Sequence, residues 1–308
     1  MIPGRVRIYE VGPRDGLQNE ATPVSTADKI AFVNALSAAG HRAIEVSAFV
    51  SPKWVPQMAD AANVFAGITR KPGVRYTALV PNLAGLSRAI DAGVDEVAVF
   101  AAASESFSQK NINQSIDASL ETYRGVCEAA TRARLPVRGY VSTAFGCPFE
   151  SAVDPAAVAR VAASLAGMGV YEVAISDTIG VAHPGQVPTV VSAVAEQVPR
   201  EQIALHFHDT RGTALANVLA ALHLGIATFD SSAGGLGGCP YAPGATGNLA
   251  TEDLLYMLDG LGIETGVSLD GVLAASRTIE ATLGHPLASR YATAARAATR
   301  RTAPPASS

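Results

Sequence analysis

The sequence is poor in cysteine and has no long apolar run. Its 308 residues include three cysteines, Cys127, Cys147 and Cys239, which cannot all pair within one chain. So few cysteines are typical of a reducing cytoplasm rather than of a disulfide-built secreted fold. No apolar run approaches the roughly 20 residues of a membrane-spanning helix. A strand-like segment begins at Val6, so we expect no signal or transit peptide. We therefore expect a soluble, cytoplasmic protein.

The chain also has little excess of negative over positive charge. The formal net charge is −4 and no block of like charge occurs, so binding to nucleic acid or a membrane surface through the protein's field alone is not expected. Hydrophobic residues make up 48% of the chain and charged residues 16%. This composition supplies a large core and excludes global disorder.

Short segments rich in Val, Ile, Tyr and Phe alternate with alanine-rich amphipathic segments. Ser25 opens one helix that Gly40 closes, and Asp154-Pro155 opens another. The expected strands are Val6–Glu10, Ala43–Val46, Arg75–Val80, Glu96–Phe100, Val137–Val141, Glu172–Ile175, Ile203–His208 and Ile226–Phe229.

Eight such alternations predict a (β/α)8 TIM barrel. A doubly wound open sheet is the alternative, but no G-x-G-x-x-G follows the first expected strand. The segment Val267–Leu283 predicts extra C-terminal helices packed on the barrel. Residues 1–290 are thus expected to form one catalytic domain and residues 291–308 a flexible tail, because the latter are polar, alanine-rich and contain Pro-Pro.

The pair His206-x-His208 is the sharpest local pattern. Side chains alternate along a strand, so the two imidazoles share one face, with Cα atoms roughly 6.5 Å apart. Two packed core histidines are the simpler interpretation. In a closed barrel, however, Asp15 after strand one and Asn248 after strand eight converge on the same point. Nitrogen and oxygen ligands without thiolate favour Mg²⁺ or Mn²⁺, although Zn²⁺ and Co²⁺ also accept imidazole.

Other polar residues follow strands at the carboxyl face, where such barrels carry their active sites. Arg14 suits stabilisation of an oxyanion or enolate, and equally an ion pair with Glu45. Cys239 lies in the segment 234–248, which is too glycine-rich for regular structure. A thiol on a mobile lid could donate a proton, while an incidental thiol is the simpler interpretation. The remaining candidates at this face are Gln18, Lys53, Asn111 and Asp177.

Three stretches resemble the 3-hydroxy-3-methylglutaryl-CoA lyase family. They are residues 11–20 (VGPRDGLQNE), residues 47–58 (SAFVSPKWVPQM) and residues 235–253 (GLGGCPYAPGATGNLATED). The resemblance runs from about Arg5 to His285. The cysteine-containing glycine loop is its most specific part, since the Arg-Asp-Gly element is shared with 2-isopropylmalate and homocitrate synthases.

The resemblance implies a role for each of these positions. Asp15, His206, His208 and Asn248 would bind the divalent cation, and Arg14 would hold the thioester oxygen as it becomes an enolate. Glu45, Asp177 and His206 would shape the site and move protons, Cys239 would protonate the product carbon, and Glu252 would support the site. From their positions at the active-site face rather than from the resemblance, Gln18, Lys53 and Asn111 are expected to bind the acyl-CoA substrate. A homodimer or higher oligomer, leucine degradation and ketone body metabolism are also implied.

The sequence departs from the family pattern at Phe207, Arg211 and Ser176 and over Thr143–Phe145, none of which is a proposed ligand. Arg211 and Phe145 leave open a lyase for a different 3-hydroxyacyl chain. A condensing acyl transferase of the same superfamily is a further alternative, which the Cys239 loop and the lack of a long C-terminal regulatory region disfavour. A third alternative is a metal-bound barrel that only binds a partner and catalyses no reaction. It would require all of these site residues to be present without a catalytic use. We therefore expect cleavage of 3-hydroxy-3-methylglutaryl-CoA to acetoacetate and acetyl-CoA.

Overall fold

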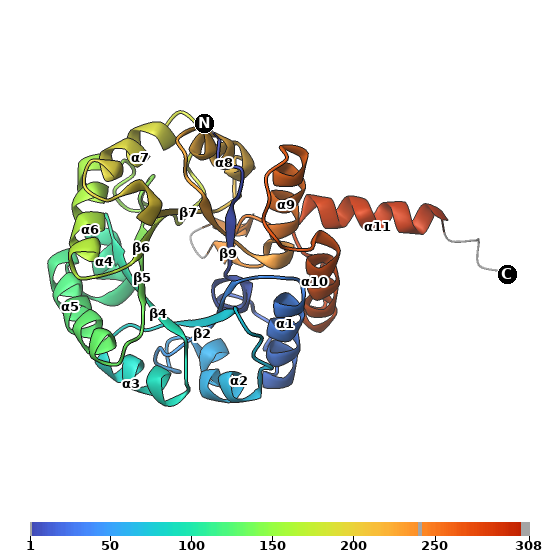
Figure 1. Ribbon diagram of the computed structural model, residues 1–308, viewed down its shortest axis with the longest axis horizontal. Coiled ribbons are helices and arrows are strands. Elements are labelled where there is room, and N and C mark those ends of the chain that lie inside the picture. Colours follow the sequence, from blue (N-terminus) through green and yellow to red (C-terminus); the bar gives the residue numbers. More distant parts are fainter. Residues whose placement is uncertain (1, 240–241, 303–308) are drawn as a thin grey trace.

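The computed structural model describes residues 2–239 and 242–302; of residues 238, 239, 242–246 and 298–302 it describes the backbone alone. Eight parallel strands form a closed barrel in chain order, with the last strand paired to the first (Figure 1). The predicted TIM barrel is confirmed. The strands are β1 Arg7–Glu10, β2 Ala43–Ala48, β3 Arg75–Leu79, β4 Glu96–Ala102, β5 Val137–Ser142, β6 Glu172–Asp177, β7 Ile203–Phe207 and β8 Thr228–Ser231.

Helices surround the barrel and begin largely where the sequence predicts. The Ser25 side chain caps the first helix by accepting a hydrogen bond from the Asp28 amide, and Asp154 caps the sixth in the same way. Gly40, with φ of +102°, turns the chain from the first helix into β2. The helices are α1 Thr26–Ala38, α2 Ala61–Gly67, α3 Leu83–Asp91, α4 Glu105–Ile112, α5 Ile116–Arg132, α6 Pro155–Gly167, α7 Val187–Ala195, α8 Ala214–His223, α9 Thr251–Gly260, α10 Leu269–Leu283 and α11 Arg290–Thr302.

Two segments differ from the prediction. The C-terminal segment, which we expected to be a flexible tail, is helical as α11 to Thr302 and extends away from the ring of helices (Figure 1). Alanine and arginine are strong helix formers, which accounts for the helix; residues 303–308 lie outside the described residues. The glycine-rich loop forms a short antiparallel hairpin of β9 (Gly238–Cys239) and β10 (Ala242–Thr246), because strand pairing uses backbone groups that glycine also has.

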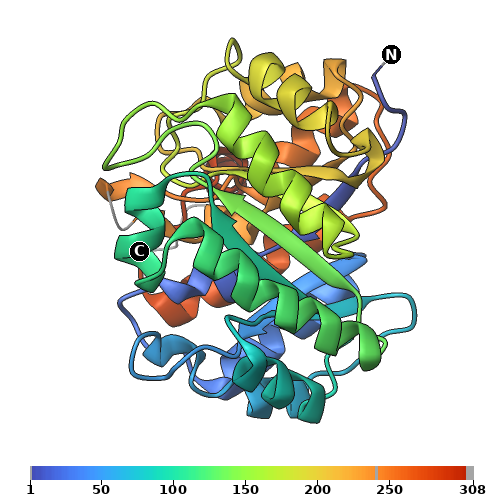
Figure 2. The same cartoon turned by 90° about the vertical axis from the view of Figure 1, so that its left-hand side faces the viewer.

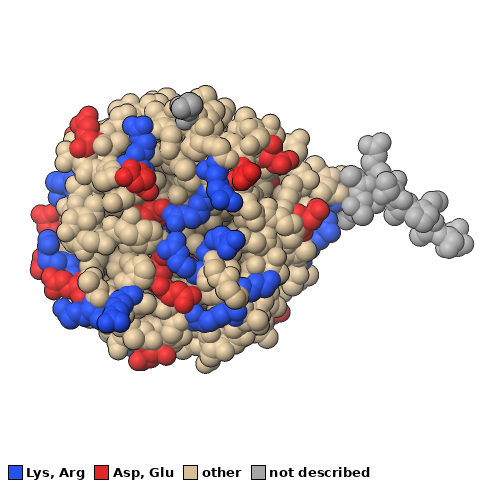
Figure 3. Space-filling model, in the orientation of Figure 1, with Lys and Arg blue, Asp and Glu red and all other residues tan. Residues whose placement is uncertain are grey.

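The two ends of the barrel differ in character. Seen from the side, the β9–β10 hairpin lies at one end and the N-terminus at the opposite end (Figure 2). Figure 3 shows Lys and Arg side chains gathered over the middle of the end that faces the viewer of Figure 1. Arg7 and Arg75, the first residues of β1 and β3, each form an ion pair with a buried glutamate, Glu172 and Glu96 respectively. The catalytic candidates follow the other ends of the strands.

Candidate active site

Arg14 and Asp15 lie on a π-helical turn, η1 (Gly12–Gly16), directly after β1. Single π turns of this kind occur frequently at functional sites. The turn packs tightly: a Cβ on Gly16 would stand 2.8 Å from the Cβ of Leu236 in the loop after β8, so only glycine fits there. This packing fixes the guanidinium and the carboxylate at the mouth of the barrel.

Asp15, His206 and His208 form a cluster of side chains that could hold a metal ion. One ligand atom from each residue lies within 4.8 Å of the other two. The Nε2 atom of His206 is 4.0 Å from Asp15 Oδ2, and that of His208 is 3.8 Å from the same oxygen. His206 lies in β7 and His208 directly follows its last residue, Phe207, so the alternation of side chains brings both imidazoles to one face, as predicted.

Asn248 reaches the cluster because its segment runs between the ends of β7 and β8. The Leu249 amide donates to the Phe207 carbonyl, and the Ser232 amide donates to the Leu249 carbonyl. Asn248 Nδ2 donates to Asp15 Oδ2 at 2.9 Å, while its buried Oδ1 has no hydrogen-bond partner among the described residues. An unsatisfied buried oxygen beside a carboxylate and two imidazoles fits a divalent cation with nitrogen and oxygen ligands.

Arg14 forms the ion pair with Glu45 that was one of the two roles expected for it, and a second ion pair with Asp15. Its Nε donates to Glu45 Oε2 at 2.6 Å, and its NH1 donates to Asp15. Burial disfavours the charged guanidinium, but the two carboxylates outweigh burial and raise the pKa of Arg14. Burial would likewise raise the pKa of Asp15, but Arg14 and a hydrogen bond from His208 hold it well below its usual range. Both groups are therefore charged at neutral pH.

Glu45 occupies an irregular point in β2, where the register with β3 shifts between Glu45 and Ser47. Bulges in strands often re-aim a side chain beside an active site. Glu45 accepts from Arg14 and from the Tyr140 hydroxyl, the latter at 3.2 Å, and burial raises its pKa above its ordinary value despite Arg14. Its Oε1 has no hydrogen-bond partner among the described residues.

Asp177 ends β6 and organises the turn that follows. Its two oxygens accept from the backbone amides of Val181 and Ala182, at 2.9 and 3.1 Å. Burial raises the pKa of Asp177, and the nearby imidazoles of His206 and His208 oppose that shift only in part. Asp177 therefore belongs to the same face of the barrel, with its carboxylate already engaged by the backbone.

Three predicted substrate-binding residues lie apart from this cluster. Lys53 is exposed in the loop after β2, Asn111 is exposed on α4, and Gln18 is half-buried after η1. Within the described part of the chain, none of their side chains forms a hydrogen bond or ion pair. The backbone of Cys239 lies in β9, and its side chain lies outside the described residues.

The structure also shows functional candidates that the sequence reasoning missed. Tyr140 lies between two arginines, with Arg14 5.6 Å and Arg138 4.9 Å from the centre of its ring. Asp230, on β8, accepts from Arg138 and contacts His206. Asp230 directly follows the expected strand Ile226–Phe229, so its position after strand eight was the available signal.

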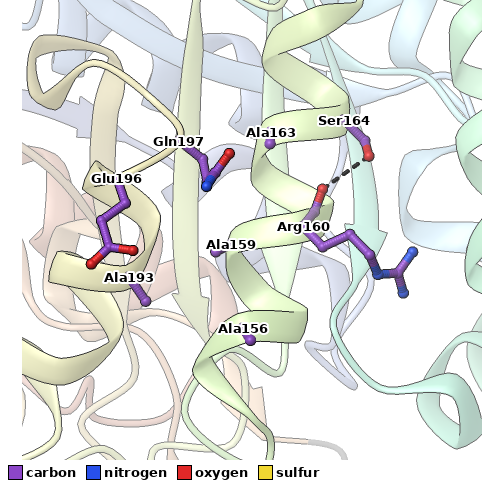
Figure 4. Close-up of a pocket in the computed structure, with 8 residues that line it drawn as sticks. All are labelled: Ala156, Ala159, Arg160, Ala163, Ser164, Ala193, Glu196 and Gln197. Atoms are coloured by element: carbon purple, nitrogen blue, oxygen red, sulfur yellow. Dashed lines mark hydrogen bonds between the residues drawn. The ribbon is translucent and has the colours of Figure 1, made fainter.

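A groove of about 600 Å³ lies outside the barrel, between α6 and α7 (Figure 4). Alanines such as Ala159 and Ala193 line it, and the side chains of Arg160 and Glu196 point away from each other. It contains none of the residues discussed above. The candidate catalytic residues are instead those at the barrel mouth.

The comparisons with known proteins agree with this geometry. The model of a family described as HMGL-like matches residues 5–279. The chain belongs to the HMGL-like family. It is 58% identical over 293 residues to the 3-hydroxy-3-isohexenylglutaryl-CoA/hydroxy-methylglutaryl-CoA lyase of Pseudomonas aeruginosa, covering 95% of this chain and 98% of that protein.

Solved structures of lyases share the fold over nearly the whole chain. The hydroxymethylglutaryl-CoA lyase structure from Pseudomonas aeruginosa superposes with a TM-score of 0.95 at 58% identity, covering 96% of this chain and 99% of that one. An HMG-CoA lyase from Acinetobacter baumannii, in complex with coenzyme A and 3-methylmalate, gives 0.90 at 41% identity, covering 94% and 95%. Within the described part of the chain, no helix combines the length and apolar character of a membrane span.

Proposed function

We propose that this chain is a carbon–carbon lyase that cleaves 3-hydroxy-3-methylglutaryl-CoA to acetoacetate and acetyl-CoA. The observation that carries the proposal is the convergence of Asp15, His206 and His208 at the barrel mouth, with Arg14 hydrogen-bonded beside them. The names of the relatives, at 52–58% identity, support the same reaction.

A divalent cation, Mg²⁺ or Mn²⁺, fits the cluster. Asp15, His206, His208 and Asn248 would hold it, and Asn248 Oδ1 is the buried acceptor that has no other partner among the described residues. When bound, the ion would supply Lewis-acid polarisation of the substrate oxygens.

The protein's own residues would then manage charge and protons. A base removes the proton of the C3 hydroxyl. A water held by Asp15 is our candidate, because His206, with Nε2 directed at the ion and Nδ1 bonded to Asp230, would have no free lone pair to accept it. The C2–C3 bond breaks, and its electrons pass to the thioester as an enolate. Arg14, held in place by Glu45, would stabilise that enolate oxygen. Protonation at C2, which we assign to Cys239, completes acetyl-CoA.

Glu45 and Asp177 would assist by shaping the site and moving protons. Burial raises the pKa of both groups toward the range in which a carboxyl group exchanges protons near neutral pH. Glu252 would support the loop after β8, since both of its oxygens accept from the Gly234 amide.

Gln18, Lys53 and Asn111 would contact the coenzyme A portion of the substrate, since each lies in the segment that follows the carboxyl end of a barrel strand. The exposed ammonium of Lys53 suits a phosphate group. We further propose that the enzyme works in the cytoplasm as a homodimer or larger oligomer, within leucine degradation and ketone body metabolism.

The decisive assay incubates the purified protein and Mn²⁺ with a panel of 3-hydroxyacyl-CoA thioesters and identifies the products by mass spectrometry. We expect acetoacetate and acetyl-CoA from the 3-methylglutaryl thioester at the highest kcat/KM. Faster cleavage of a longer branched thioester would revise the substrate. Carbon–carbon bond formation alone, without cleavage of any thioester, would overturn the lyase assignment.

A further inference from the structure

We propose that Asp230 is a positioning residue that holds the His206 imidazole in the tautomer and orientation required for metal binding. The proposal rests on the divalent cation site proposed above. It concerns a carboxylate that does not itself face the cluster of Asp15 and His208.

Asp230 and His206 are direct neighbours in the barrel wall. They are register partners on adjacent strands β8 and β7. Asp230 Oδ2 lies 3.2 Å from His206 Nδ1, and the opposite nitrogen, Nε2, faces Asp15. An imidazole that donates its Nδ1 proton to Asp230 leaves the Nε2 lone pair directed at the cluster.

The carboxylate is itself fixed from behind. Arg138 on β5 donates to both oxygens of Asp230, from NH1 at 3.1 Å and from NH2 at 2.6 Å. The Nε of Arg138 donates to Glu172 on β6 at 2.8 Å. All three side chains are fully or almost fully buried, so the oxygen that accepts from His206 has little freedom to move.

This arrangement follows a general rule of metal sites in proteins. A histidine that binds a metal usually donates its other ring N–H to a carboxylate, and losing that partner weakens metal affinity roughly 10- to 100-fold. The bidentate pair with Arg138 fixes the orientation of the Asp230 carboxylate, and therefore the direction in which it accepts a hydrogen bond from His206.

The first test compares two isosteric variants of the same buried network. Asp230→Asn removes the charged partner of both Arg138 and His206, whereas Glu172→Gln weakens a partner of Arg138 and leaves His206 untouched. Mn²⁺ affinity is measured by electron paramagnetic resonance, and folding by thermal unfolding. We expect Asp230→Asn to bind Mn²⁺ at least about tenfold more weakly, and Glu172→Gln to bind within about twofold of wild type, at comparable losses of thermal stability.

A second measurement determines the His206 tautomer in the wild-type protein itself. Long-range ¹H–¹⁵N spectra of the histidine-labelled wild-type protein, at a pH where the imidazole is neutral, report which ring nitrogen carries the proton. The His206 signal is identified by its loss in His206→Gln. We expect the Nδ1–H form of His206 before metal is added; the Nε2–H form would overturn the proposal.

The outcomes separate this inference from the proposed function. Failure of the wild-type protein to bind Mn²⁺ would contradict the proposed metal site, and with it both the proposed function and the role of Asp230. If the wild type binds Mn²⁺ but Asp230→Asn binds it equally well, only the positioning role is wrong. Equal losses of affinity in Asp230→Asn and Glu172→Gln would reduce Asp230 to a structural role.

Discussion

Two of the buried charged clusters in the barrel differ in how many of their polar atoms have hydrogen-bond partners. In the core cluster of Arg138, Glu172 and Asp230, each guanidinium nitrogen donates to a carboxylate. In the mouth cluster around Arg14 and Asp15, Glu45 Oε1 and Asn248 Oδ1 lack hydrogen-bond partners among the described residues.

The difference separates charges that serve the fold from charges that serve a ligand. A buried polar atom without a partner costs free energy, and the fold tolerates that cost where a ligand supplies the missing partner. The core cluster has no such capacity left and can only position its neighbours. The mouth cluster retains acceptors for an ion or substrate, and the predictions below test this division.

We expect the largest effect from Cys239, the native thiol to which we assign protonation of the substrate carbon. Cys239→Ser should fold and bind Mn²⁺ normally but lose roughly 10²- to 10⁴-fold in kcat, the usual range for removing general acid catalysis. Cys147→Ser is the matched control, because Cys147 is buried against Ser104. Steady-state turnover decides the matter, and a wild-type rate in Cys239→Ser would make the thiol a bystander. Alkylation of the free enzyme should also inactivate it, with protection by substrate and metal.

Arg14 should show the next largest effect. Arg14→Gln removes an enolate partner worth about 3 kcal/mol, so kcat should fall roughly a hundredfold or more with little change in KM. The same substitution at the opposite end of the barrel, Arg75→Gln, breaks the ion pair with Glu96 and should leave kcat near the wild-type value. A rise in KM alone for Arg14→Gln would show that Arg14 only binds substrate.

A smaller effect should come from Glu10, a buried carboxylate with no positively charged partner among the described residues. It accepts from the amides of Gly12 and Ala233, and its buried neighbour His41 stays neutral because burial lowers the pKa of His41 to about 3. Burial raises the pKa of Glu10 from 4.5 to about 7. The folded state thus binds this proton more tightly than the unfolded state, so the stabilisation is present at low pH and is lost as pH rises toward 7.

Glu10→Gln removes this pH dependence. From about pH 5 to 7, the free energy of unfolding of the variant should rise relative to the wild type by about 2 to 3 kcal/mol. Urea unfolding at several pH values measures the difference. The exposed Glu264 supplies the control, since Glu264→Gln should follow the wild-type curve. Parallel curves for Glu10→Gln and the wild type would contradict the protonated state of Glu10.

The sequence predicted the strands and the mouth cluster better than the core cluster. Alternation along β7 was enough to place His206 and His208 on one face, and chain order was enough to bring Asp15 and Asn248 beside them. Asp230 and Arg138 interact across the barrel interior, through the stagger of β5, β6 and β8, which periodicity within one strand does not encode. Tyr140 could not be predicted for the same reason. Its place between Arg14 and Arg138 depends on contacts between different elements of the closed barrel.

The most direct test of the account is a Mn²⁺ titration of the metal-depleted wild-type protein, with bound metal and cleavage of 3-hydroxy-3-methylglutaryl-CoA followed in the same samples. His208→Ala is the control, since it removes one proposed ligand and keeps the core cluster intact. We expect activity to appear in proportion to bound Mn²⁺, and His208→Ala to lose Mn²⁺ affinity and turnover together. Full activity in the metal-depleted protein, or an unchanged titration of His208→Ala, would contradict it.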